Sequence, residues 1–158
     1  MIPLKINDTH LCKIFEPGLD ISTWSDNDVQ RYSISKQMFP TSVALTSETY
    51  SRDAERTADY ELENLLIVNR KAKPEFTWSL IKASYVEMLL AFLNYTYDFK
   101  DSYGDVIPVD APDIRVTYKD FTGTRTINSY LGQTIEGVLV EYEGVQYWEN
   151  FRIAFPER

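Results

Sequence analysis

The stretch SYVEMLLAFLNYTYDF, residues 84–99, is the part of the sequence around which the fold is predicted to form. Its apolar side chains recur at i, i+3, i+4 and i+7, the spacing of one helical face: Val86, Leu89, Leu90 and Leu93. Ser84 and Glu87 have the spacing of a capping box, in which each side chain satisfies a backbone amide of the other residue. The sequence therefore predicts a helix from Tyr85 to Tyr97.

Further apolar side chains widen this stripe beyond what one packing face needs: Met88, Phe92 and Tyr95. Two interpretations of the wide stripe stay open. The helix is buried on most of its sides by its own fold, or it also contacts a neighbouring subunit. Under the second interpretation, Met88, Phe92 and Tyr95 are the predicted interface residues.

Alternation of apolar and polar residues predicts antiparallel strands on both sides of this helix. Before the helix the predicted strands are Ile2–Ile6, Leu11–Phe15, a short strand within Tyr32–Phe39, Tyr60–Arg70, and, after a connection at Lys71–Pro74, Glu75–Ile81. After the helix they are Ile114–Lys119, Thr124–Leu131, Ile135–Tyr142 and Val145–Phe155. The sequence therefore predicts a β-rich α+β fold, an antiparallel β-barrel or sandwich with one flanking α-helix, in a single domain spanning residues 1–158.

Two long stretches lack usable periodicity, residues 24–52 and 98–113. Loops longer than about 12–15 residues are uncommon in compact domains unless they are functional or disordered. We expect both to be assembly elements, with Trp24, Phe39 and Tyr103 as aromatic anchors. The second stretch is rich in Asp but lacks the ligand order of an EF-hand, which favours a solvated acidic loop over a calcium site.

The charge and hydropathy of the chain argue against two classes of partner. With 16 basic and 24 acidic residues the net charge is −8, which disfavours a protein that grips nucleic acid. No apolar run approaches the roughly 20 residues that a membrane-crossing helix needs, so no membrane insertion is expected. The N-terminal sequence lacks a signal pattern, and we expect the chain to stay on the side of the membrane where it is made.

Residues with catalytic chemistry are scarce. His10 and Cys12 are the only histidine and cysteine, and a chance pairing of the two on one strand face is favoured over a catalytic dyad. The sequence lacks a glycine-rich phosphate loop and the motifs GxSxG and HExxH. A pair of carboxylates for glycoside hydrolysis stays open, because any two of them could meet in the fold. The sequence predicts no enzyme, and neither cofactor nor metal.

Two segments carry an ordered set of motifs, residues 54–80 and 116–158. The first has Ala-Glu-Arg-x-Ala from Ala54 and a basic strand leading to Trp78. The second has V-x-Y-x-D from Val116 and, further on, Thr122-Gly123, Arg125-Thr126, Tyr130 with Gly132, Gly144-Val145 before Trp148, Phe155 and Glu157-Arg158. In these features the chain resembles a family of small tail-region proteins of phages and prophages of Gram-positive bacteria.

This resemblance implies a structural component of a phage tail or baseplate, with a tail-tube-like fold, assembled as a ring around the tail channel. Its partners would be other copies of itself in a hexameric ring and neighbouring tail or baseplate proteins, with DNA only as transient cargo. It would be located in the virion and made in the bacterial host cytoplasm. The alternatives are a receptor-binding module and a host-interaction module encoded in the same gene region, and the kind of tail component stays open.

Overall fold

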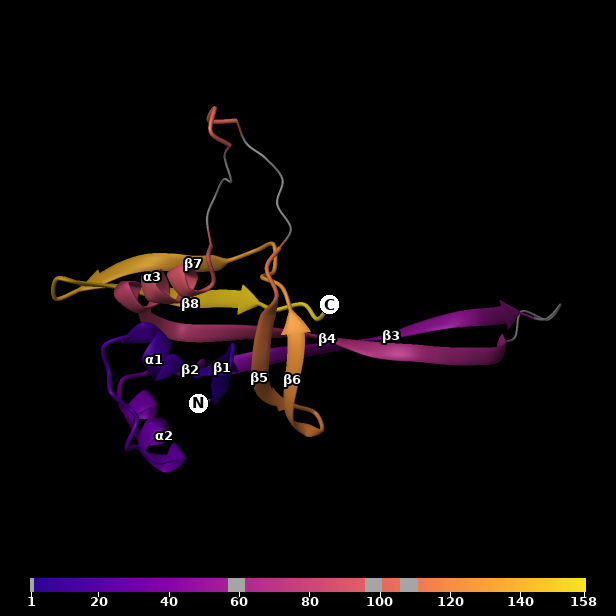
Figure 1. Cartoon of the computed structure of the whole chain (residues 1–158), viewed down its shortest axis with the longest axis horizontal. Coiled ribbons are helices and arrows are strands. Elements are labelled where there is room, and N and C mark those ends of the chain that lie inside the picture. Colours follow the sequence, from indigo (N-terminus) through magenta and orange to yellow (C-terminus); the bar gives the residue numbers. More distant parts are fainter. Residues whose placement is uncertain (1, 57–61, 96–100, 106–110) are drawn as a thin grey trace.

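The structure, a computed structural model, describes residues 2–56, 62–95, 101–105 and 111–158, and for residues 48–56 and 62–70 it describes the backbone alone. In these residues eight strands form two four-stranded antiparallel sheets (Figure 1). The first sheet has the order β2 (Thr9–His10), β1 (Leu4–Ile6), β5 (Ile114–Asp120) and β6 (Gly123–Ser129). The second sheet has the order β3 (Ser42–Arg56), β4 (Leu62–Lys82), β8 (Val145–Ala154) and β7 (Glu136–Tyr142). The predicted β-rich α+β fold with antiparallel sheets is confirmed, and within the described part of the chain neither sheet closes into a barrel.

Large side chains from both sheets meet in one hydrophobic cluster. The ring of Phe76 in β4 lies 6.0 Å from that of Tyr118 in β5 and 6.0 Å from that of Phe155, which follows β8. Trp78 is 1% exposed, and its indole Nε1 donates a 2.8 Å hydrogen bond to the carbonyl of Met38. Each fully buried side chain of this size contributes roughly 1.5–3 kcal/mol. These contacts hold the two sheets together.

The described residues contain three helices rather than one: α1 (Leu11–Phe15), α2 (Asp26–Ser35) and α3 (Ala83–Phe92). The predicted strand Leu11–Phe15 is wrong, because this segment forms a helical turn that buries four of its five side chains. The predicted short strand within Tyr32–Phe39 and the irregular stretch 24–52 are also wrong, since α2 and β3 occupy most of this region. Ser25 caps α2 and forms a reciprocal capping box with Asp28.

Helix α3 is the predicted helix with different ends. It begins at Ala83 because β4 leads into it directly, and its N-cap is Lys82, which makes no side-chain cap hydrogen bond. Ser84 lies inside the first turn, so the predicted capping box with Ser84 as the cap is wrong. It ends at Phe92, and Asn94 takes a left-handed conformation (φ 56°) that is common just after a helix. The predicted inner stripe is confirmed, since Val86, Leu89 and Leu93 are all buried: 5%, 0% and 3% exposed.

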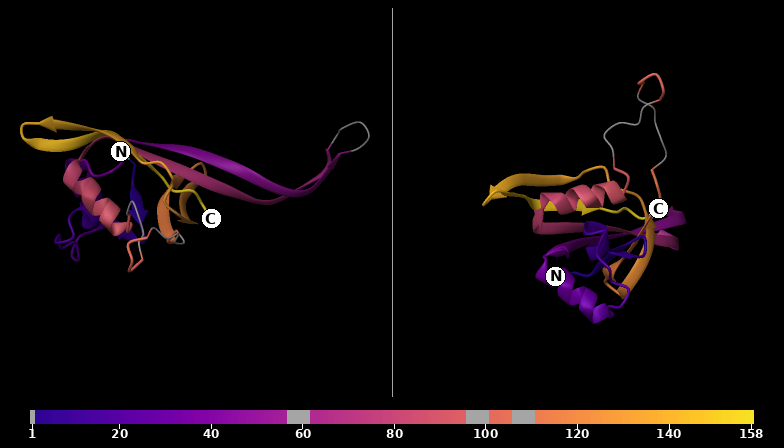
Figure 2. Two further views of the ribbon diagram at one scale, coloured as in Figure 1. Left: turned by 90° about the horizontal axis from the view of Figure 1, so that it is seen from above. Right: turned by 60° about the vertical axis from the view of Figure 1, so that its left-hand side comes forward.

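Strands β3 and β4 form one long hairpin. The predicted connection at Lys71–Pro74 is wrong, because β4 runs through these residues and pairs with β3, with Pro74 opposite Leu45. The pairing of β4 with β8 begins at Glu75. Toward its tip, from residues 48 and 71 to residues 56 and 62, the hairpin extends away from the rest of the molecule (Figures 1 and 2). We call this part the β3–β4 ribbon.

The last third of the chain follows the prediction closely. Strands β5 to β8 lie within one or two residues of the predicted strands. The predicted turn at Glu143-Gly144 has left-handed φ values of 51° and 81°, the geometry of a two-residue type I′ hairpin. Of the predicted loop 98–113, residues 101–105 form a turn, residues 111–113 have no regular structure, and the others lie outside the described residues.

Candidate assembly surface

The β7–β8 hairpin exposes an apolar surface on one face of the second sheet. Register pairs Val140 with Tyr147 and Tyr142 with Val145, and Val138 follows on the same face because alternate residues of a strand share a face. We call these five residues the β7–β8 patch. Val138 is 58% exposed, Tyr142 51% and Val145 43%. Exposed apolar surface of this kind marks interaction sites in soluble proteins.

Polar contacts hold the tyrosines of the β7–β8 patch in place. The rings of Tyr142 and Tyr147 lie 6.0 Å apart at 55°, and the Tyr142 hydroxyl donates a 2.9 Å hydrogen bond to Glu149 Oε1. This hydrogen bond raises the pKa of Tyr142, because the phenol must keep its proton to donate it. Tyr142 is therefore a positioned, exposed aromatic residue, the type favoured at interfaces.

The opposite face of β7 points toward α3. Leu139 pairs with Trp148, and Trp148 packs against the hydrophobic cluster. Leu139 nevertheless remains 49% exposed. The hairpin thus presents apolar side chains on both of its faces.

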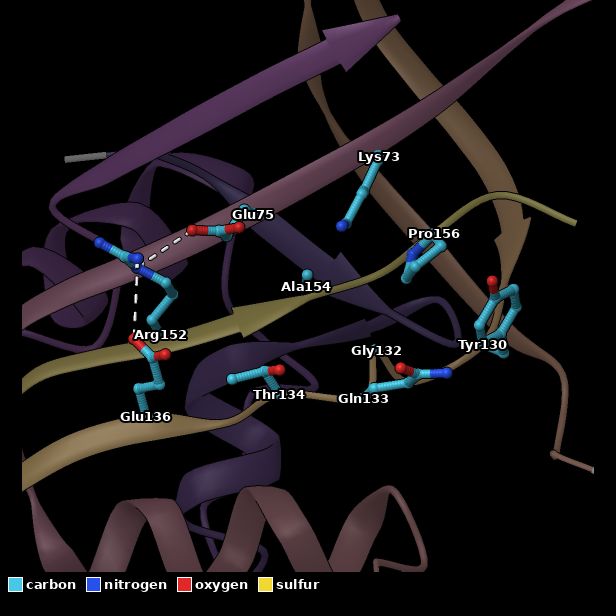
Figure 3. Close-up of a pocket in the computed structure, with 10 residues that line it drawn as sticks. All are labelled: Lys73, Glu75, Tyr130, Gly132, Gln133, Thr134, Glu136, Arg152, Ala154 and Pro156. Carbon is cyan, nitrogen blue, oxygen red and sulfur yellow. Dashed lines mark ion pairs between the residues drawn. The ribbon is translucent and has the colours of Figure 1, made fainter. Parts of the chain in front are cut away.

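A polar cleft of about 340 Å³ lies further along the same sheet (Figure 3). Arg152 of β8 pairs with Glu75 of β4 at 3.0 Å and with Glu136 of β7 at 3.7 Å. The Arg152 side chain is half exposed, so solvent weakens these ion pairs. Figure 3 shows the ammonium group of Lys73 directed into the cleft, and Lys73 makes no ion pair within the described residues. The cleft can therefore receive a carboxylate from a partner.

Gly132 closes one side of this cleft against Ala154. The amide of Gly132 donates a 2.9 Å hydrogen bond to the Ala154 carbonyl, and a Cβ on Gly132 would lie 3.0 Å from that oxygen. A Cβ here would be tighter than an ordinary contact, so this close approach favours glycine at position 132. This contact gives a structural reason for the glycine in the motif that pairs Tyr130 with Gly132.

Both edges of the second sheet are open within the part of the chain that the structure describes. Strand β7 has a neighbour only in β8, and β3 only in β4. Residues that flank a two-residue hairpin turn hydrogen-bond to each other, so alternation directs the backbone amides of Leu139 and Glu141 away from β8. Such unpaired edges can add a strand from another chain.

The predicted interface residues lie in separate places. On α3, Met88 is 37% exposed, Tyr95, just beyond its end, is 36% exposed, and Phe92 is partly buried against the hydrophobic cluster. Tyr103 is 90% exposed on the turn 101–105. The turn 101–105, which carries Tyr103, lies apart from α3 (Figure 1).

The other two predicted anchors are less accessible. Trp24 is half-buried and packs on Tyr32 of α2, with ring centroids 5.2 Å apart. The Tyr32 hydroxyl donates to the Glu16 carboxylate, which raises the pKa of Tyr32 to about 12. Phe39 is only 7% exposed in the hydrophobic cluster, so it does not project from the surface as an aromatic anchor.

Sequence reasoning missed the β7–β8 patch. The alternation in Glu136–Tyr142 correctly indicated a strand, but it equally fits a strand with a buried face. The pairing of apolar residues across the Glu143-Gly144 turn was the available signal, and it does not say whether another layer covers them.

Burial disfavours the charged forms of His10 and Cys12, the two residues considered for a catalytic dyad. Cys12 is 0% exposed in α1, and burial raises the pKa of its thiol. Burial lowers the pKa of His10, and the nearby Lys5 adds to this effect. The described residues contain no group of His, Cys, Asp and Glu side chains placed to hold a metal ion. No described helix is long and apolar enough to cross a membrane.

Comparison with known proteins gives one structural likeness. No protein-family model matches the sequence, and no curated protein matches it. A solved structure described as "Tail of empty GTA particle computed with helical refinement, C6 symmetry" contains a similar chain, with a TM-score of 0.38 and 15% sequence identity. The likeness covers 74% of this chain and 74% of that one.

Proposed function

We propose that this protein is a structural component of a phage-like tail or baseplate, and that copies of it assemble as a ring around the tail channel. The sequence motifs shared with phage tail-region proteins support the tail assignment. The projecting β3–β4 ribbon is the observation that carries the assembly role. In this proposal the whole chain acts as one domain, is made in the host cytoplasm and ends up in the virion.

Within the described residues, the backbone of the ribbon pairs with no third strand. From Thr49 opposite Arg70 to Arg56 opposite Leu62, β3 and β4 pair only with each other. A two-stranded hairpin alone is at best marginally stable in water, and both of its outer edges carry unpaired backbone groups. A neighbouring subunit laid against the ribbon would supply both pairing and cover. The ribbon is therefore the element by which one copy reaches the next.

The open edges of the second sheet supply the ring contact. A ring of identical subunits needs two different, complementary surfaces on each copy. The edge of β7 and the edge of β3 lie at opposite sides of one sheet, so β7 of one copy can pair with β3 of the next. The β7–β8 patch adjoins this edge and would be covered on assembly. We propose six copies in the ring, with additional contacts through Met88, Phe92, Tyr95, Trp24 and Tyr103.

The charge of the chain suits a channel that DNA crosses. At −8 a subunit repels the phosphate backbone, so DNA would pass as cargo without being retained. The proposed partners are other copies of the chain and neighbouring tail or baseplate proteins.

A shortened hairpin tests the proposal. Residues 49–70 are replaced by Asn-Gly, so that the paired residues Glu48 and Lys71 flank a two-residue turn. Wild-type chain should form rings or short tubes in negative-stain electron microscopy, while the shortened chain should stay folded by circular dichroism and remain monomeric. The matched control replaces only residues 57–61 by Asn-Gly and keeps the ribbon, so it should still assemble.

Two results would count against the proposal. Wild-type chain that stays monomeric under all assembly conditions and binds a cell-surface component instead would favour the receptor-binding or host-interaction alternatives. A shortened chain that assembles as well as the wild type would show that the ribbon has no assembly role.

A further inference from the structure

A second cleft, of about 380 Å³, opens between α2 and the first sheet. Its wall is apolar where Leu4, Val29 and Phe39 line it. Its volume lies within the roughly 300–1,000 Å³ of clefts that take small ligands, so it can hold an aromatic side chain with its neighbours. Lys5 and Lys119 also line the cleft.

The charged side chains that line this cleft carry a net positive charge. Neither Lys5 nor Lys119 makes an ion pair within the described part of the chain. Asp26 contributes one carboxylate. His10 also lines the cleft, and its lowered pKa keeps it neutral at neutral pH. The cleft is therefore lined by two ammonium groups and one carboxylate beside its apolar residues.

The turn at residues 101–105 has the complementary chemistry. One carboxylate oxygen of Asp101 accepts hydrogen bonds from the amides of Tyr103 (2.8 Å) and Asp105 (3.0 Å). The Asp101 carbonyl also accepts from the amide of Gly104 at 3.1 Å, and Gly104 has a left-handed φ of 85°. These bonds close the turn and leave the Tyr103 side chain 90% exposed between two acidic residues. A preformed turn that presents a tyrosine loses little conformational entropy on binding.

Turn and cleft lie apart within one subunit. Figure 1 and the right view of Figure 2 place residues 101–105 at the top and α2, which borders the cleft, at the bottom, although the left view of Figure 2 shows both on the same face of the second sheet. The turn of one copy is therefore separated from its own cleft. A contact between them joins two copies head to tail, the arrangement from which rings and stacks are built.

We propose that the turn 101–105 of one copy docks in this cleft of a second copy, with Tyr103 inserted among the apolar residues and Asp101 and Asp105 facing Lys5 and Lys119. This contact rests on the proposed self-assembly and names a surface that the β-sheet edges do not use. The aromatic ring supplies the buried anchor, and the opposite charges set the orientation.

Photo-crosslinking tests the contact directly. Tyr103 is replaced by benzoylphenylalanine in the full-length chain, heavy-isotope and unlabelled copies are mixed under assembly conditions, and cross-linked peptides are identified by mass spectrometry. We expect heavy–light cross-links from position 103 to residues 3–5, 26–30 or 117–119. Cross-links to another segment, or to another tail protein, would overturn the docking while rings of wild-type chain would still support the proposed function. Absence of any oligomer in mass photometry of the wild type would contradict both.

Matched variants give the second readout. Tyr103→Ala should weaken self-association about 30-fold, the loss expected for a buried aromatic anchor, and Tyr103→Phe should keep it. Asp105→Lys should weaken it, and Lys119→Glu in the same chain should restore it. All three positions are exposed at the surface, so the monomer should stay folded. Unchanged association of Tyr103→Ala, or no rescue of the charge swap, would overturn the contact.

Discussion

The carboxylate of Glu157 joins the two sheets, and its removal should destabilise the fold by about 2 kcal/mol. It accepts hydrogen bonds from Arg125 of β6 at 2.8 Å and from the backbone amide of Ala72 in β4 at 3.0 Å. Hydrogen bonds to a charged group contribute roughly 1.5–3 kcal/mol each. Arg125 is 34% exposed and remains 3.6 Å from Asp120 after the change, so solvent and Asp120 reduce its share of the loss. The amide of Ala72, left without this acceptor, accounts for most of the effect.

The loss of free energy of unfolding is measured by urea titration of the wild type, Glu157→Ala and Glu157→Gln. The glutamine keeps an oxygen that can accept from Ala72 and should lose only about 1 kcal/mol, because the bond becomes neutral. The midpoint should shift with the slope unchanged, as for a pure change in stability. Glu141→Ala is the control, since this exposed residue makes no ion pair in the described structure and should change stability by less than about 0.5 kcal/mol. Equal stability of Glu157→Ala and wild type would refute the reasoning.

Three further predictions follow from particular atoms. Among the described residues the buried hydroxyl of Tyr118 finds no hydrogen-bond partner, so Tyr118→Phe should raise the free energy of unfolding by about 1 kcal/mol in urea titrations, whereas a loss of stability would reveal a partner. Glu141→Pro removes a backbone donor from the open edge of β7, so it should abolish ring formation as seen by electron microscopy. The control Glu141→Ala should assemble normally. Rings formed by the proline variant would exclude the β7 edge as the ring contact. The pKa of Tyr32 is raised above its unfolded value of about 10 to about 12, so the stability it contributes is present below pH 10 and lost as the pH rises to 12. Urea unfolding of Tyr32→Phe should lack this loss, and an identical pH profile for both chains would contradict it.

The sequence predicted those strands whose signals are local. In Ile114–Asp120 three apolar residues alternate with polar ones, and left-handed residues mark the turns at Gly123 and Gly144. Helix α2 was missed because its exposed polar surface dominates its composition, with only Val29 and Ser33 buried. The Ser25–Asp28 capping box was its available signal.

Both parts of β4 were predicted as strands, but their continuity through residues 71–74 was missed because a proline and flanking lysines are typical of a turn. Pro74 lies where the pairing with β8 ends, one of the places where a strand tolerates proline. Alternation alone also could not separate Val116, which is 0% exposed, from Val138, which is 58% exposed. Whether another layer covers a strand depends on residues far away in the sequence.

Cryo-electron microscopy of particles assembled from the wild-type chain tests the proposed ring assembly. We expect a closed ring in which the β3–β4 ribbon of each copy lies against a neighbour and the β7 edge pairs with β3 of the next copy. A ring whose ribbons project into solvent without touching another subunit would contradict it.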